Sequence, residues 1–234
     1  MTRQPETVPR APLSRERVLR AAVALADSIG IEALSMRRLA QELGVVPMAL
    51  YKHVAHKEEL LDGMVETVVG EIPPPAPGTG WRGAVRLRIL SARAALLGHP
   101  WAAQVIRSRT GPTPAVLAHM DAVIGTFRAG GLSVDLTHHA MHALGSRVLG
   151  FTQEVFDAAP GPAPRPPAAL PPEAAAAYPH VAELALAAAH DGDSVVGGGC
   201  DDQFEFEFAL DLLLGGFERL HRQGWTSAGG GAAG

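Results

Sequence analysis

The segment that most constrains the fold of this chain covers residues 35–57, SMRRLAQELGVVPMALYKHVAHK. Its large apolar residues recur at helical spacing, so two short helices can each bury one face against a common core: Leu39, Leu43, Leu50 and Val54. Gly44 follows the first of these helices, where a left-handed backbone is common and glycine bears no steric cost. Ser35 is a good N-cap for the first helix, and Pro47 is tolerated in the first turn of the second. The spacing predicts a helix-turn-helix, a motif that reads DNA; an ordinary helical hairpin with a glycine in its turn is the alternative on these residues alone.

The sequence on both sides of this segment favours the DNA-reading interpretation. Residues 14–30, SRERVLRAAVALADSIG, carry one apolar face between a serine cap and a glycine stop, and residues 56–72, HKEELLDGMVETVVGEI, carry another behind an acidic first turn. Positions 39–64, LAQELGV…LYKHVAHKEELLDGM, resemble the signature of the TetR family of transcriptional regulators. The resemblance implies an all-α fold, in which an N-terminal three-helix helix-turn-helix domain is joined by a long helix to a larger helical ligand-binding and dimerisation domain.

The same resemblance implies which residues contact DNA. Arg37 resembles a base-contacting arginine, and residues 47–49 stand where the recognition helix meets base edges. The polar residues between 51 and 57 look like contacts to backbone phosphate and the groove edge. The implied DNA-binding residues are Arg37, Val46, Pro47, Met48, Ala49, Tyr51, Lys52, His53 and Lys57. Met36 departs from the family pattern, which often has a phosphate-binding hydroxyl there. An arginine can bind guanine bidentately, while Met48 and Ala49 offer only apolar contact, for example to a thymine methyl.

The charge distribution agrees with a DNA-binding N-terminal part. Residues 1–57 carry nine Lys and Arg against five Asp and Glu, whereas the rest of the chain carries 11 against 19. Both lysines of the protein, Lys52 and Lys57, fall in the helix-turn-helix segment. An acidic protein with one basic end suits specific DNA binding better than indiscriminate coating of DNA.

A chain of 234 residues is longer than a DNA reader alone needs, which predicts a second, larger helical domain. The expected organisation is a disordered arm over 1–13, the helix-turn-helix domain with its connecting helix over 14–72, the ligand-binding and dimerisation domain over 80–222 and a disordered tail over 223–234. The sequence has no apolar run of 18 or more residues and no apolar core of a signal peptide, so we expect a soluble, cytoplasmic protein without membrane contact. The single cysteine, Cys200, excludes an intramolecular disulfide and a CxxC metal site.

Proline and glycine divide the rest of the chain into helices. Apolar spacing predicts helices over residues 81–98, 99–109, 114–129, from the cap Ser133 to about 156, 172–190 with a break near Pro179, and 202–222. Loops or flexible segments are expected over residues 72–80, 158–172 and 191–200.

The segment 204–220, FEFEFALDLLLGGFERL, alternates its first three phenylalanines as a strand would, but its later leucines fit a helical stripe, so we interpret it as helix. With the helix that follows Ser133, it resembles the pair of helices through which TetR-family proteins dimerise as a four-helix bundle. The expected interface residues are Leu149, Gly150, Phe206, Leu210, Leu213, Leu214 and Phe217. Packing within one subunit is the alternative, but a single helix-turn-helix reads too short a site to compete with genomic DNA.

Residues 80–222 resemble, more loosely, the tetracycline-repressor type of C-terminal domain, which holds a ligand between long helices. The candidate lining residues are Arg88, His99, Trp101, Ile106, Met120, Val123, Phe127, His138 and Met141. Met and aromatic residues at helical spacing can equally belong to a core. Ile106 and Val123 are apolar where contacts to a magnesium-chelated drug are expected, which disfavours tetracycline itself and indicates a small, largely apolar effector.

His138 and His142 lie one helical turn apart and Asp135 a turn earlier, a spacing that could chelate zinc, although Asp135 could equally serve the helix dipole. We expect no metal, no cofactor and no catalytic activity. The sequence therefore predicts a repressor that binds palindromic double-stranded operator DNA as a homodimer and is released by an unknown small molecule. A DNA-binding regulator without an effector, and a histidine-based metal-binding or enzymatic helical protein, are the alternatives.

Overall fold

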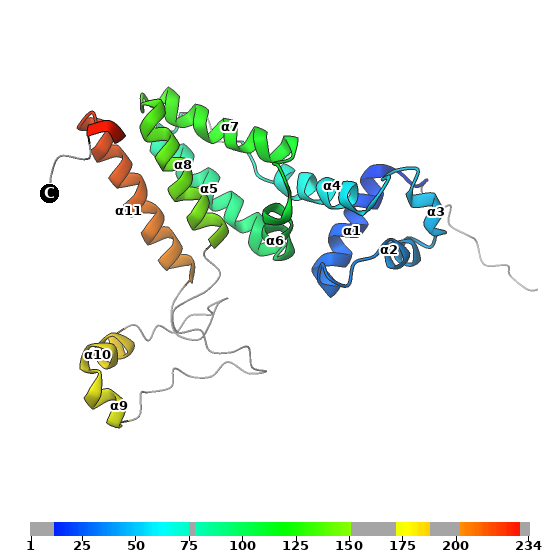
Figure 1. Cartoon of the computed structure of the whole chain (residues 1–234), viewed down its shortest axis with the longest axis horizontal. Coiled ribbons are helices and arrows are strands. Elements are labelled where there is room, and N and C mark those ends of the chain that lie inside the picture. The colour runs from blue at the N-terminus through cyan, green and yellow to red at the C-terminus, as the bar shows by residue number, and fades with distance from the viewer. Residues whose placement is uncertain (1–11, 75–77, 151–171, 188–201, 230–234) are drawn as a thin grey trace, which may run out of the picture. The chain divides into compact units, whose positions relative to one another are not determined.

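The computed structural model describes residues 12–74, 78–150, 172–187 and 202–229. All regular secondary structure in these ranges is helical, as predicted (Figure 1). The chain divides into two compact units, Met1–Pro74 with Ser91–Ala122, and Pro75–Leu90 with Val123–Gly234. Two long helices, α5 (Trp81–Gly98) and α7 (Pro114–Ala129), each contribute residues to both units. None of the described helices has the length and apolar character needed to cross a membrane.

The first unit contains α1 (Arg15–Ile29), α2 (Met36–Leu43), α3 (Pro47–Leu50), α4 (Lys57–Gly70) and α6 (Trp101–Ser108). Local capping explains where three of these helices begin. The hydroxyls of Ser14 and Ser35 each accept a hydrogen bond from a backbone N–H three residues on, at 3.2 Å. At α4, the Glu59 N–H donates to His56 Nδ1 (3.1 Å), and the Glu59 carboxylate accepts from the backbone N–H of Ala55 (2.7 Å).

The turn of the helix-turn-helix depends on Gly44, which adopts the left-handed backbone conformation with φ 64°. Its N–H donates to the carbonyls of Ala40 and Gln41 and so ends α2. Gly63 of α4 allows close approach of α1, because a Cβ there would lie 2.6 Å from Leu19 Cδ2. The four apolar residues predicted to form a common core are all buried: Leu39, Leu43, Leu50 and Val54.

Helix α6 is held against α1 and α4 by polar contacts around Asp27 of α1. Trp101 donates its indole N–H to Asp27 Oδ1 (2.6 Å), and His99 Nδ1 lies 2.9 and 3.0 Å from the two oxygens of the same carboxylate. The other ring nitrogen of His99 lies 3.3 Å from Glu71 Oε2. The α6 residues that complete the apolar core of this unit are Trp101, Ala102 and Val105.

These contacts make the stability of the first unit depend on pH. Burial would lower the pKa of His99, but the hydrogen bonds and charges of Asp27 and Glu71 outweigh it and raise the pKa above its ordinary 6.5. A raised pKa means that the contribution of the protonated imidazole is complete below the unfolded-state value and disappears as the pH rises through the folded-state value. We therefore expect the Tm difference between the wild type and His99→Gln to be largest near about pH 6 and to shrink toward about pH 9.

Thermal melts across this range measure the effect. In an Asp27→Asn background, the same difference should lose most of its pH dependence, because the main partner of the imidazolium is gone. A difference that stays constant in the wild-type background would contradict the assignment.

The second unit packs parts of α5 and α7 against α8 (Val134–Gly150) and α11 (Asp202–Arg222). Phe127 lies in its core, with its ring centroid 5.6 Å from that of Trp81 and 6.2 Å, edge-on, from that of Phe217. Arg86 of α5 pairs with two carboxylates of α11, at 2.6 and 2.8 Å. The remaining described helices are α9 (Pro172–Ala177), α10 (Pro179–Ala187) and the 3-10 turn η1 (Ser227–Gly229).

The bounds of α5, α7 and α11 are those predicted from the sequence, and Pro179 begins α10 where the break was expected. Helix α6 begins two residues later than predicted, since Pro100 occupies its N-cap. Residues 223–229, expected to belong to a disordered tail, instead contact α8: Ser227 donates to Asp135, and Trp225 packs 5.5 Å from His139 between ring centroids. The parts of the prediction that lie outside the described residues are the end of α8 near 156, the segments 158–171 and 191–200, and Cys200.

Candidate nucleic-acid interface

The second helix of the helix-turn-helix has exposed apolar residues at its start and a buried residue at its end. Leu50 anchors α3 in the core, whereas the residues at the start of this helix face solvent. Val46 and Met48 are 67% and 71% exposed, and Pro47 between them is exposed as well. Large apolar side chains that lie this open next to one another are available for contact with another molecule.

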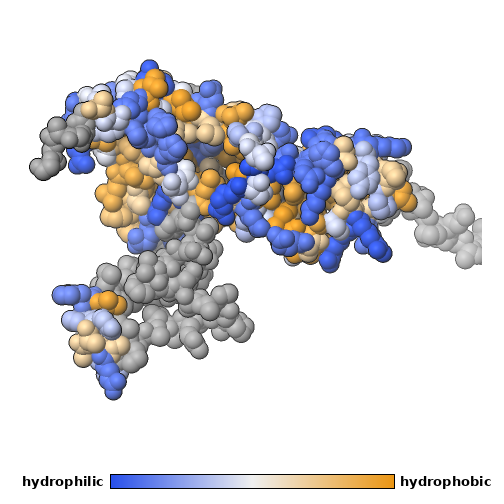
Figure 2. Space-filling view, viewed as in Figure 1, coloured by the Kyte–Doolittle hydropathy of each residue, from blue (hydrophilic) through white to orange (hydrophobic). Residues whose placement is uncertain are grey.

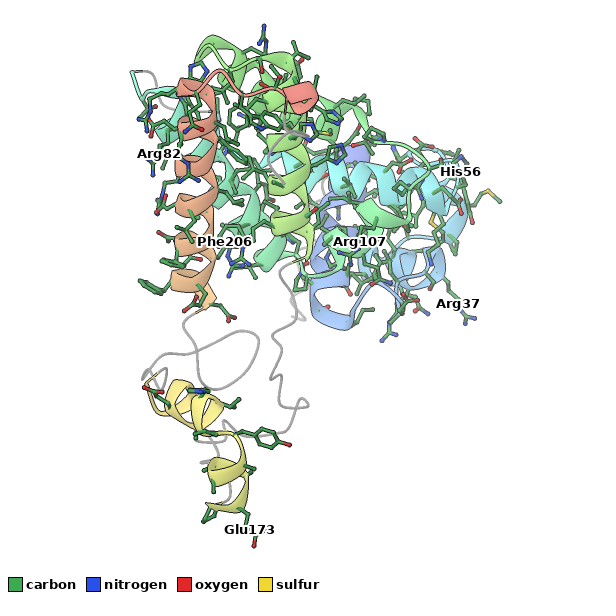
Figure 3. The ribbon with its side chains drawn as sticks, turned by 60° about the vertical axis from the view of Figure 1, so that its left-hand side comes forward. Arg37, His56, Arg82, Arg107, Glu173 and Phe206 are labelled. Atoms are coloured by element: carbon green, nitrogen blue, oxygen red, sulfur yellow. The ribbon has the colours of Figure 1, made fainter. Side chains whose placement is uncertain are left out.

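The same motif carries cations that are not used in ion pairs. Arg37, Lys52 and Lys57 are exposed, and none has a carboxylate partner among the described residues. Arg37 points from α2 into solvent (Figure 3). By contrast, Arg20 of α1 pairs with Glu16 one turn away, at 3.4 Å. Unpaired surface cations are the groups that neutralise DNA phosphates.

Of the nine residues predicted to contact DNA, Arg37 lies on α2, and the others lie between Val46, the N-cap of α3, and Lys57, the first residue of α4. Seven of them are exposed, and Ala49 and His53 are partly buried. Met36, where the family often has a hydroxyl, packs partly against the core. Arg38 is a further exposed cation beside Arg37. The family resemblance implied only one base-contacting arginine on α2, so Arg38 was not predicted. Contact of these residues with DNA stays a prediction.

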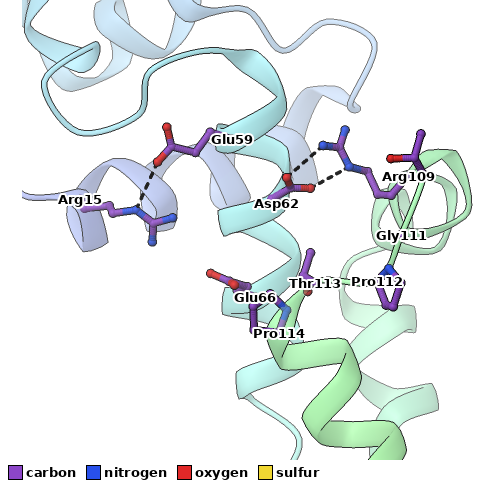
Figure 4. Close-up of a pocket in the computed structure, with 10 residues that line it drawn as sticks. Arg15, Glu59, Asp62, Glu66, Arg109, Gly111, Pro112, Thr113 and Pro114 are labelled. Atoms are coloured by element: carbon purple, nitrogen blue, oxygen red, sulfur yellow. Dashed lines mark hydrogen bonds and ion pairs between the residues drawn. The ribbon is translucent and has the colours of Figure 1, made fainter.

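A charged cavity of about 370 Å³ lies in the first unit, between α1, α4 and the segment that leads into α7 (Figure 4). Arg109 binds Asp62 bidentately, with Nε–Oδ1 at 2.7 Å and Nη2–Oδ2 at 3.0 Å, and Arg15 lies 4.0 Å from Glu59. Arg109 thus ties the end of α6 to α4. No sequence pattern predicts this contact, because its partners are 47 residues apart.

The residues predicted to line a ligand site are divided between the two units. His99, Trp101, Ile106 and Met120 belong to the first unit, where the polar atoms of His99 and Trp101 bind Asp27. In the second unit, Val123 and Phe127 are core residues, and His138 is exposed. Arg88 is partly buried, and Met141 is partly buried against that core. These nine residues do not share one core, and the ligand site stays a prediction.

Four of the predicted dimer-interface residues lie inside the subunit instead: Phe206, Leu210, Leu214 and Phe217. They face inward because α11 carries two apolar stripes, and this one packs against α8 and α5. The other stripe consists of Phe204, Phe208 and Leu212, which are 60%, 54% and 61% exposed. Hydrophobic side chains gather on the surface over α11 (Figure 2). Leu149 and Leu213 are partly buried and, with Gly150, stay predictions.

The histidines of α8 lie close together without a third ligand. The ring centroids of His138 and His142 are 4.6 Å apart, and both side chains are exposed. Asp135 instead accepts hydrogen bonds from the N–H and the hydroxyl of Ser227, at 2.6 and 2.8 Å, which lower the pKa of its carboxyl. Within the described ranges, no group of three or more His, Cys, Asp or Glu side chains is placed to hold a metal ion.

Two family models match the chain. Residues 18–64 match the bacterial regulatory proteins of the tetR family, and residues 74–221 match the tetracyclin repressor-like C-terminal domain. The first match covers the helix-turn-helix, and the second begins before α5 and ends within α11.

Known proteins resemble the chain over different lengths. The transcriptional repressor DrrR1 of Streptomyces coeruleorubidus is 40% identical over 133 residues. The aligned region is 56% of this chain, and the chain spans about half (49%) of the length of DrrR1. The class G tetracycline repressor protein of Vibrio anguillarum is 30% identical over 213 residues, which cover 89% of this chain and 95% of that one. The structure of the Streptomyces coelicolor TetR family protein ActR in complex with (S)-DNPA matches with a TM-score of 0.66 and 28% identity, over 90% of this chain and 100% of ActR. On these matches, the chain belongs to the TetR family of bacterial regulatory proteins.

Proposed function

We propose that this chain is a ligand-responsive transcriptional repressor, which binds a palindromic operator as a homodimer and leaves it when a small, largely apolar effector binds. The observation that carries the proposal is the exposed edge at residues 46–48, on a motif whose cations Arg37, Lys52 and Lys57 have no carboxylate partner in the described structure. Such cations bind phosphates, and a short exposed helix can enter a major groove. The relative DrrR1 is named a transcriptional repressor, and ActR has been solved with a small molecule.

The proposed role is binding rather than catalysis, carried out in the cytoplasm. Residues 14–72 would form the DNA-binding domain and residues 80–222 the ligand-binding and dimerisation domain, with an arm and a tail at the two ends. The family matches over 18–64 and 74–221 support this division.

The packing of helix α6 supports direct coupling between effector binding and DNA binding. It belongs to the segment matched by the C-terminal family model, yet its side chains pack in the same core as α1 and α4. A displacement of α6 therefore acts on the DNA-binding helices through packed side chains. The effector releases DNA only if it binds the displaced form more tightly than the operator-bound form, since differential affinity alone shifts the equilibrium.

A homodimer would place two recognition helices in successive major grooves, roughly 34–36 Å apart. The exposed stripe of α11, formed by Phe204, Phe208 and Leu212, supports this assembly, because a row of large apolar side chains is suited to burial against a second copy.

Operator binding tests the proposed DNA contacts. We expect Arg37→Ala to lose discrimination worth about 1–3 kcal/mol at the base that it contacts, so that specificity is relaxed. We expect Lys57→Ala to weaken binding to every duplex and to reduce the slope of log affinity against log salt by about one. Fluorescence anisotropy measures both effects, with DNA from beside the protein's own coding region and a scrambled duplex.

Arg20→Ala is the matched control, because Arg20 is an exposed arginine of the same unit that is paired with Glu16. It should bind operator as the wild type does. Unchanged binding in both Arg37→Ala and Lys57→Ala would contradict the site assignment.

A further inference from the structure

The methionines of the described residues differ widely in their access to solvent. Met48, at the start of α3, is 71% exposed, and Met120 of α7 is 40% exposed. Met64 is fully buried, and Met36 and Met141 pack partly buried against the two cores. The thioether of Met48 is therefore the one, in this part of the chain, that a dissolved oxidant reaches most easily.

Met48 also lies in the middle of the surface proposed to read DNA. Residues 46–49 are Val, Pro, Met and Ala, so every side-chain contact that they make with base edges is apolar. Leu50 is fully buried in the core and holds α3 with Val46, Pro47 and Met48 on the outside. The sulfur of Met48 is the one atom in these four side chains that an oxidant can convert from apolar to polar.

Oxidation by hydrogen peroxide changes what this side chain can contact. A lone pair of the thioether sulfur forms a bond to one peroxide oxygen, the O–O bond breaks, and the other oxygen leaves as water. The sulfur is oxidised to the sulfoxide and the peroxide is reduced, so no further reactant is needed. The sulfoxide is polar, and its burial against an apolar groove edge without a hydrogen-bond partner is unfavourable.

We propose that Met48 is an oxidation site through which peroxides release this regulator from DNA. The proposal rests on the proposed operator binding and adds a mode of regulation that acts at the DNA-reading surface itself. It requires no effector, because the modified atom is part of the proposed contact. Methionine sulfoxide reductases return the sulfoxide to the thioether, one enzyme for each epimer, so the modification is reversible.

Peptide mapping locates the modification, because cleavage after lysine and arginine separates the methionines of the described residues. Each lies in a peptide of its own: Met36 in 21–37, Met48 in 39–52, Met64 in 58–82, Met120 in 110–128 and Met141 in 129–147. After limited treatment of the full chain with hydrogen peroxide, mass spectrometry should find the added oxygen first in peptide 39–52. Cys200 is the one thiol of the chain and also reacts with peroxide, so every protein in the experiment carries Cys200→Ser.

Operator anisotropy before and after treatment measures the consequence. We expect the parent Cys200→Ser protein to lose about 10- to 100-fold in operator affinity, the effect of burying one polar group without a partner. Its Tm should change by less than about 2 °C, because the Met48 side chain lies outside the core. Treatment with both methionine sulfoxide reductases should restore the affinity.

Three variants of the parent protein assign the effect to one residue. Met48→Leu keeps an apolar side chain of similar volume that peroxide does not oxidise, so its affinity, whatever its starting value, should be the same before and after treatment. Met120→Leu removes the second most exposed methionine of the described residues and should lose affinity on treatment as the parent does. Met48→Gln places an uncharged polar group at the same position and should bind operator about as weakly as the oxidised parent.

Three results would overturn the proposal: oxidation of peptide 110–128 before peptide 39–52, unchanged operator affinity once peptide 39–52 is oxidised, or the same loss of affinity in Met48→Leu as in the parent. A fall in Tm that accompanies the loss of affinity would also contradict it, because it indicates oxidation of Met36 or Met64, which pack in the core. Failure of the untreated parent to bind operator would contradict the proposed function together with this regulation. Operator binding that survives oxidation of Met48 would contradict the regulation alone.

Discussion

Replacement of Phe208 by glutamate is expected to convert the protein into a folded monomer that binds its operator at least about 100-fold more weakly. Phe204, Phe208 and Leu212 recur every four residues on the outer face of α11, so a twofold contact through this face would bury them against their copies. Glutamate at position 208 would place two like charges in that contact without partners. Within the subunit the substitution disturbs little, because more than half of the side chain is already exposed.

Analytical ultracentrifugation and operator anisotropy measure the two parts of this result, and circular dichroism reports whether the fold is retained. Leu117→Glu is the control, since Leu117 is 51% exposed on α7 and outside the α11 stripe. Phe206→Ala tests the buried stripe of α11 instead of the exposed one. Phe206 is fully buried within the subunit, so its truncation should lower the stability of the protomer by about 3–5 kcal/mol. A Phe208→Glu protein that sediments as a dimer would exclude this face as the interface.

Gly130→Ala is expected to destabilise the protein by about 2–3 kcal/mol and to lower Tm by roughly 5–10 °C. A Cβ at this position would lie 2.5 Å from Cγ and Cδ1 of Trp81 and 2.6 Å from its Cβ. These atoms are near the backbone of the tryptophan and cannot move aside as the end of a flexible side chain can. The ring of Trp81 also packs against Phe127, so a shift of the tryptophan disturbs the core of the second unit.

Gly125→Ala in α7 is the matched control, and its expected effect has the opposite sign. No atom lies within 4 Å of a Cβ built there, so the substitution should stabilise the helix by up to about 1 kcal/mol. Chemical denaturation of both variants measures the pair. Equal stabilities of Gly130→Ala and the wild type would show that the close packing of Trp81 on Gly130 does not occur in solution.

The helix-turn-helix could be predicted in detail because its signals are local. Ser35, Gly44 and Pro47 act through caps and backbone conformation within a few residues of themselves, and each occupies the position expected of it. The apolar residues that bury the motif follow helical spacing, which depends only on the sequence nearby.

The side-chain environments that could not be predicted depend on contacts between distant segments. Helix α11 was correctly predicted, but which of its two apolar stripes is buried within the subunit was not, because both have helical spacing and only packing against α8 and α5 decides it. Similarly, nothing near His99 and Trp101 indicates that their polar atoms bind Asp27, which lies 72 and 74 residues away. A carboxylate on another helix thus binds the polar atoms of two residues that were predicted to contact a ligand.

The packing of α6 also limits how this regulator can be re-engineered. A chimera that joins residues 1–74 to the sensor of another regulator would leave behind Trp101, Ala102 and Val105, which complete the core around α1 and α4. The transplanted DNA-binding domain would then expose apolar surface, and Asp27 would lose its contacts with His99 and Trp101. The new ligand-binding domain would have to supply a helix of matching shape and two equivalent polar side chains. The DNA-binding domain therefore does not have a complete core of its own, and a chimera must retain α6 together with it.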